Sequence, residues 1–62
     1  MLSKSKRKEI AKRIAQLEQK RINNPEFAKE AEDELMAIPE KYELDLVDLL
    51  EIDDMVQRIL NN

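Results

Sequence analysis

The chain contains no glycine, and this absence constrains its fold more than any other feature of the sequence. Two-residue hairpin turns hold residues at positive φ, which glycine adopts at little cost, so a chain without glycine is poorly suited to antiparallel sheets. Alanine, leucine, isoleucine, glutamate, lysine and arginine dominate instead, and most of these favour helices. We therefore expect an all-α fold.

The length of 62 residues limits the chain to one small helical domain. A chain of this size buries only about 60% of its unfolded surface, so it usually needs a further source of stability. Cysteine and histidine are absent, which excludes disulfides and Cys/His zinc sites. We expect a small three-helix bundle, or a helical hairpin plus a third helix, with dimerisation as a way to complete either.

Apolar spacing and capping residues predict where the first helix lies. Ser3 or Ser5 can cap a helix over about residues 5–23, whose apolar residues recur at three- and four-residue steps. Asn24 can cap the next helix, and Pro25 suits its first position. A break between two helices is therefore expected at this point.

The second predicted helix covers residues 25–38, because Pro39 should end or kink it at the residue before. The third covers residues 46–60. Asp45 can cap this helix, and Asp48 lies three residues later, near the positive end of the helix dipole.

The third helix carries apolar residues over roughly half of its circumference. One neighbouring helix cannot cover so wide an arc, so we expect two neighbours or a partner chain. The residues expected to form a core or a subunit seam are Leu46, Leu49, Leu50, Ile52, Val56, Ile59 and Leu60.

Asp53 falls inside this apolar arc. If Asp53 is buried, its carboxylate needs water or a cation such as Arg13 or Arg21. The alternative, favoured by the rarity of fully buried charges, is that the arc ends before Asp53 and leaves it exposed.

Three of the seam residues also fit an L-x-x-L-L pattern, which helical binding peptides use: Leu46, Leu49 and Leu50. Any leucine-rich acidic helix produces such a match, and a peptide motif works only when it is exposed. We expect these leucines to pack in a core or seam instead.

Charge is divided unevenly along the chain. Residues 1–24 have a net charge of +6 and residues 25–62 a net charge of −9. The polar side of the first helix carries a basic stripe that could contact nucleic acid, formed by Lys6, Lys8, Lys12, Arg13 and Lys20. We favour a solvated stripe that partly pairs with the acidic helices, because the acidic remainder repels a polyanion and no aromatic residue stands beside the stripe.

The sequence lacks the residue combinations that enzymes commonly use for catalysis. It has no Ser/His or Cys/His pair and no glycine-rich phosphate loop, and its hydroxyls are Ser3, Ser5 and Tyr42. The acidic residues between 45 and 54 lack the glycine of a calcium-binding loop and the histidines of di-metal bundles. We expect no enzyme activity, no cofactor, no metal and no small-molecule substrate.

These features favour a small protein-protein interaction module with a regulatory or accessory role, which self-associates, most simply as a dimer, through the third helix. One alternative is a nucleic-acid-binding accessory protein that uses the basic stripe. A further alternative is an acidic inhibitor or antitoxin-like module that masks a basic partner. No run approaches the ~18 apolar residues of a membrane span. We therefore expect a cytoplasmic protein, and its short length suits a bacterial or phage origin.

Overall fold

The computed structural model describes residues 2–62 and contains three α-helices. These are α1 (Lys4–Asn23), α2 (Ala28–Lys41) and α3 (Leu46–Leu60), and a 3-10 turn, Pro25–Phe27, precedes α2. No strand occurs in this part of the chain. The predicted all-α fold is confirmed. None of the described helices is both long and apolar enough to cross a membrane.

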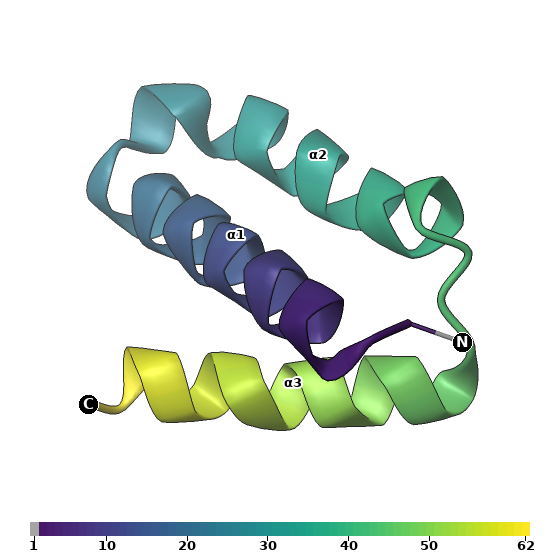
Figure 1. Cartoon of the computed structure of the whole chain (residues 1–62). Coiled ribbons are helices and arrows are strands. Elements are labelled where there is room, and N and C mark those ends of the chain that lie inside the picture. Colours follow the sequence, from purple (N-terminus) through teal and green to yellow (C-terminus); the bar gives the residue numbers. More distant parts are fainter. Residues whose placement is uncertain (1) are drawn as a thin grey trace.

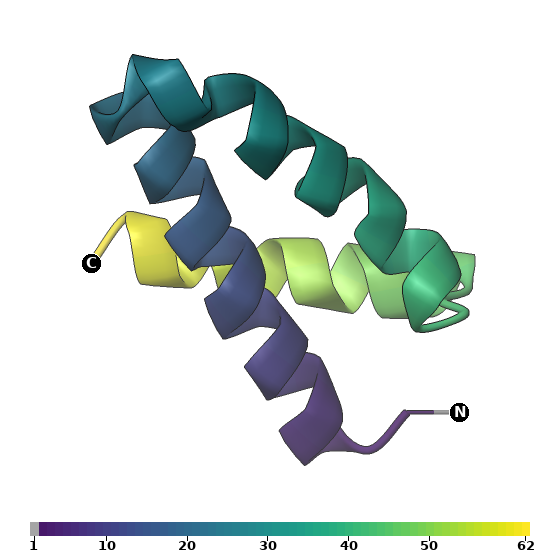
Figure 2. The ribbon, with the colours of Figure 1, turned by 90° about the horizontal axis from the view of Figure 1, so that it is seen from above.

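Helix α1 lies between the other two helices (Figure 1). Helix α2 runs back along α1 after the turn at Asn24, and α3 crosses α1 obliquely when seen from above (Figure 2). Both α2 and α3 pack mainly on α1 rather than on each other. The Cα atoms span 35 × 27 × 16 Å, so the molecule is flat and much of each outer helix faces solvent.

Side chains cap α1 and α3 where the sequence predicts. The Ser3 side chain accepts a hydrogen bond from the Lys6 backbone N–H at 3.1 Å, so Ser3 rather than Ser5 is the cap of α1. Asp45 caps α3 through a 2.8 Å hydrogen bond from the Asp48 N–H, and the Asp48 side chain accepts a longer one from the Asp45 N–H at 3.4 Å. This reciprocal capping box fixes the first turn of α3.

The break between α1 and α2 is confirmed, but backbone hydrogen bonds form it instead of the predicted side-chain cap. The Asn24 N–H donates to the Lys20 carbonyl, and the Asn24 carbonyl accepts from the Phe27 N–H, both at 2.9 Å. The Asn24 side chain makes no capping hydrogen bond. Pro25 begins the 3-10 turn, and regular α-helix starts only at Ala28.

The predicted end of α2 at Ile38 is wrong, because the helix continues through Pro39 to Lys41. Proline lacks the N–H that would donate to the carbonyl four residues earlier, so one hydrogen bond of the helix is missing, but the helix does not end there. The Pro39 carbonyl accepts a 2.9 Å hydrogen bond from the Leu44 N–H, and the Glu40 carbonyl accepts one from the Glu43 N–H at 3.2 Å. These two bonds form a Schellman motif that terminates α2.

Glu43 occupies the left-handed position of this motif, with φ of 52°. Glycine is the usual residue there, because a Cβ atom makes the left-handed conformation unfavourable. Since the chain has no glycine, a glutamate adopts the strained conformation so that the chain can turn from α2 into α3.

The core lies along α1, which supplies half of the eight buried apolar side chains. Ala11 and Ala15 let a neighbouring helix approach closely, because their side chains are short. Helices α2 and α3 contribute two buried apolar residues each. The helix covered on two sides is therefore α1, whereas the sequence suggested α3. The buried residues are Ile10, Ala11, Ala15, Leu17, Ala31, Ile38, Ile52 and Val56.

Replacing Glu43 with glycine should raise the free energy of unfolding by about 1 kcal/mol, because the strain of the left-handed conformation is removed. Urea denaturation measures this change. Glu43→Ala is the control, since it removes the charge and keeps the Cβ atom, and it should leave stability nearly unchanged. A glycine variant no more stable than the alanine variant would contradict this account of the turn.

Candidate functional site

The residues expected to form a core or seam on α3 do not all pack inside the molecule. Ile52 and Val56 are buried, and Leu60 is half-buried against the core. The prediction of core burial is wrong for the other four, which are exposed: Leu46, Leu49, Leu50 and Ile59. A role for these four as a seam with another chain stays a prediction.

Three of the exposed residues, Leu46, Leu49 and Leu50, lie on adjacent turns of α3 and are named the leucine face. Their exposed fractions are 71%, 38% and 64%. The apolar arc of α3 is wider than the side that α1 covers, so these leucines fall outside the contact. The core of this chain therefore does not hide the L-x-x-L-L pattern, and its burial in a seam with another chain stays a prediction.

Asp53 is exposed, as the favoured alternative expected, and its burial is excluded. The two cations considered for it are engaged elsewhere. Arg13 pairs with Glu34 at 2.8 Å and Arg21 with Glu18 at 2.7 Å. Within residues 2–62, no ion pair forms at Asp53.

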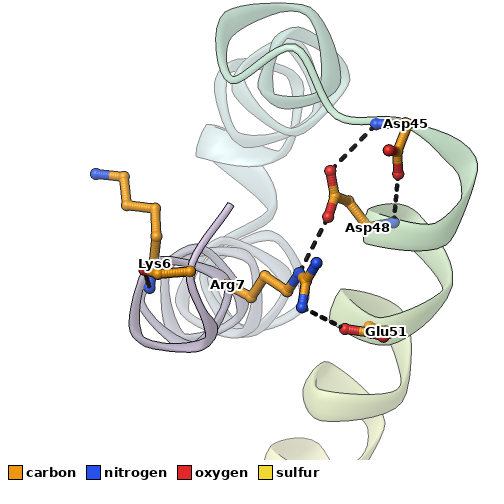
Figure 3. A network of polar contacts seen from close by, with 6 residues as sticks. Lys6, Arg7, Asp45, Asp48 and Glu51 are labelled. Atoms are coloured by element: carbon orange, nitrogen blue, oxygen red, sulfur yellow. Dashed lines mark hydrogen bonds and ion pairs between the residues drawn. The ribbon is translucent and has the colours of Figure 1, made fainter. Parts of the chain in front are cut away.

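Asp48 is the buried carboxylate of α3, with a side chain only 4% exposed. One oxygen, Oδ2, closes the capping box with the Asp45 N–H. The other, Oδ1, accepts a 3.0 Å hydrogen bond from Nε of Arg7 on α1. Figure 3 shows Arg7 reaching from α1 to this carboxylate and to Glu51, whose Oε2 lies 2.8 Å from Arg7 Nη1.

We name Arg7, Asp45, Asp48 and Glu51 the arginine clasp. The Arg7 side chain is 14% exposed and joins the first turns of α1 to the first turns of α3. Because a buried charge without a partner is costly, the clasp fixes how α3 begins against α1.

Sequence reasoning missed Arg7 as a partly buried cation and Asp48 as a buried carboxylate. A signal was present, since Arg7 precedes Ile10, Ala11 and Ile14 by three, four and seven residues. That spacing places Arg7 on the apolar side of α1 rather than on the basic stripe. A cation on an apolar face needs a buried acid, and Asp48 supplies it.

The clasp sets the pKa of Asp48. Burial acts to raise this pKa, but hydrogen bonds from Arg7 and Asp45 and the charge of Arg7 together outweigh burial, so the pKa lies below its ordinary value of 3.8. The hydrogen bond from Arg13 likewise lowers the pKa of Glu34 at the surface. Both carboxylates are ionised at neutral pH.

The five residues of the basic stripe do not form one free cationic surface. Lys6 lies 3.5 Å from Glu9 and 5.4 Å from the centre of the Tyr42 ring, and Lys20 lies 5.2 Å from that of Phe27. Arg13 pairs with Glu34 on α2. The predicted pairing with the acidic helices is thus confirmed in part. Three members of the stripe make no ion pair within the described residues: Lys8, Lys12 and Lys20.

Two open hollows lie on the surface. One, of about 250 Å³, lies between α1 and the end of α3, where Met55 and Ile59 are surrounded by cations. The cations are Lys4, Lys8 and Arg58. The other, of about 180 Å³, adjoins the clasp beside Asp45 and Asp48. In the part of the chain that the structure describes, no three acidic side chains gather closely enough to hold a metal ion.

Comparison of the chain with protein-family models, curated proteins and solved structures gives no match.

Replacing Arg7 with methionine should lower the free energy of unfolding by about 1–3 kcal/mol, because Asp48 then stays buried without its charged partner. Arg58→Met is the matched control. It breaks the exposed pair with Asp54 and should change stability by less than about 0.5 kcal/mol. Urea denaturation of both variants measures the difference, and equal effects would show that the clasp is no more than a surface pair.

The stability contributed by the Asp48 carboxylate should depend on pH. Because the folded pKa is below the unfolded one, this contribution is complete above the unfolded pKa and is lost as pH falls through the folded value. Wild type should therefore exceed Asp48→Asn in stability from about pH 7 to about pH 5, and the difference should shrink below about pH 4. Urea denaturation at several pH values tests this, and a difference independent of pH would contradict it.

Proposed function

We propose that the chain is a small protein-binding module without enzyme activity, and that the leucine face is its contact surface. A regulatory or accessory role belongs to the same proposal. The observation that carries it is the exposure of Leu46 and Leu50, at 71% and 64%, on a helix whose opposite side is core. Isolated exposed leucines are ordinary, but leucines on adjacent turns form a continuous apolar patch, which is typical of interaction sites.

The rigidity of this part of α3 supports the proposal. The capping box and the arginine clasp hold the helix where the leucine face begins, so the leucines are ordered before any partner arrives. Binding to a face that is already ordered loses less conformational entropy than folding a segment on contact. Burial of the leucines would then contribute about 25 cal/mol per Å² of apolar surface.

The alternative of nucleic-acid binding has less support, because three of the five residues of the basic stripe already contact acidic or aromatic side chains. Self-association through the leucine face remains a proposal of the same class, since a second copy is also a protein partner. A cytoplasmic location and a bacterial or phage origin stay predictions of the sequence.

A photo-crosslinking amino acid at position 50, in the chain expressed in its native host, should yield a covalent protein adduct. The control places the same amino acid at position 36, because Met36 is 73% exposed and lies on α2, away from the leucine face. Gel electrophoresis and mass spectrometry identify the adduct and show whether it is a second copy. Failure to crosslink at position 50, with efficient crosslinking at position 12 on the basic stripe, would contradict the proposal.

A further inference from the structure

We infer that the leucine face receives a basic amphipathic helix from another protein. This inference rests on the proposed function and names the chemistry of the partner. It is carried by the acidic charge of α3, which has four acidic residues and one basic residue, and by Asp53, which makes no ion pair within the described residues.

Asp53 lies on the leucine face itself, four residues after Leu49 and three after Leu50. Glu43 and Asp45 stand just before the helix but line the hollow beside the clasp, and Asp45 already accepts the capping hydrogen bond from the Asp48 N–H, so neither belongs to the leucine face. Asp53 forms no ion pair within residues 2–62. It is therefore available to a lysine or arginine side chain of a partner.

The cations of the clasp and of α3 do not compete for Asp53. Arg7 is committed to Asp48 and Glu51, and Arg58, the only cation of α3, pairs with Asp54 at 3.0 Å. An apolar ridge with the carboxylate of Asp53 on it, on a helix that is acidic overall, matches a partner that offers apolar residues with cations beside them.

Charge also disfavours a second copy at this surface. In a symmetric dimer the same face is present on both sides of the interface. Asp53 of one leucine face would then approach Asp53 of the other, and like charges across an interface oppose association. A basic partner replaces this repulsion with attraction.

A helical partner fits the spacing of the leucines. Leu46, Leu49 and Leu50 stand at i, i+3 and i+4 on a regular helix and form a ridge. Ridges of this kind pack into the grooves between the side chains of a second helix. A helix with apolar residues at three- and four-residue steps presents such grooves along one side.

The probe that tests the inference is a synthetic helical peptide of about 16 residues, long enough to hold some helix alone. It carries leucines at three- and four-residue steps with lysines on both sides. Two matched peptides replace every lysine with glutamate or with glutamine, and a third scrambles the lysine peptide. Isothermal titration with the full chain should give binding by the lysine peptide that weakens as salt is raised, and much weaker binding by the other three.

Variants of the chain show whether the binding uses the leucine face. Leu50→Ser should weaken binding of the lysine peptide about tenfold or more, whereas Met36→Ser should not. Met36 is a matched control because it is 73% exposed and lies on α2. Asp53→Lys should weaken the lysine peptide about tenfold and strengthen the glutamate peptide. Circular dichroism confirms that each variant is folded.

The outcomes separate this inference from the proposed function. Equal binding of all three patterned peptides, lost in Leu50→Ser, would overturn the basic partner and leave the leucine face as a contact surface. Sedimentation that shows self-association, abolished by Leu50→Ser, would replace the basic partner with a second copy. Absence of binding by the lysine peptide would overturn the inference, and crosslinking at position 50 would then decide the proposed function by itself.

Discussion

The two-sided burial of α1 is the constraint on which the other helices depend. Helix α2 buries Ala31 and Ile38, and α3 buries Ile52 and Val56, and both helices do so mainly against α1. Helices of this length are marginal alone in water, so their stability comes from packing. Since α2 and α3 pack little on each other, neither has a core without α1. This arrangement also explains the flat shape and the large solvent-facing area of the outer helices.

The uneven charge of the chain places opposite charges on neighbouring helices in this arrangement. The basic first third forms the central helix, and the acidic remainder forms the helices on either side of it. Most pairs that result are exposed and contribute little. The exception is the arginine clasp, where Asp48 is buried and both of its oxygens accept hydrogen bonds. The same carboxylate thus caps α3 and anchors it to α1, which links the start of the helix to its position in the fold.

Local chemistry allowed much of the fold to be predicted. The caps at Ser3 and Asp45 and the break at Asn24 depend on a few neighbouring residues, so they are readable from the sequence. The end of α2 could not be predicted in this way. It is formed by hydrogen bonds that the N–H groups of Glu43 and Leu44, which lie beyond the proline, donate to the Glu40 and Pro39 carbonyls.

The site was harder to predict, because it depends on tertiary geometry. Leu50 and Ile52 are both aliphatic, yet Leu50 is 64% exposed and Ile52 only 2%. The hydrophobic pattern of α3 gives the width of the apolar arc but not which part of it α1 covers. Asp48 illustrates the same point, since a residue on a predicted acidic surface is buried once Arg7 reaches it. The spacing of Arg7 was the one signal that could have revealed this.

Neither helix propensity nor burial against α1 explains why the residues of the leucine face are leucines. Leucine, glutamate and lysine have similar helix propensities, so the first turns of α3 would form with charged residues at Leu46 and Leu50. Burial against α1 does not require these leucines either, because Ile52 and Val56 supply the apolar contacts of α3 with the core. Their apolar surface stays in water, where it opposes solubility. Leu46 and Leu50 are thus exposed and lie outside the core, and this is the observation that supports the proposal that they contact another chain.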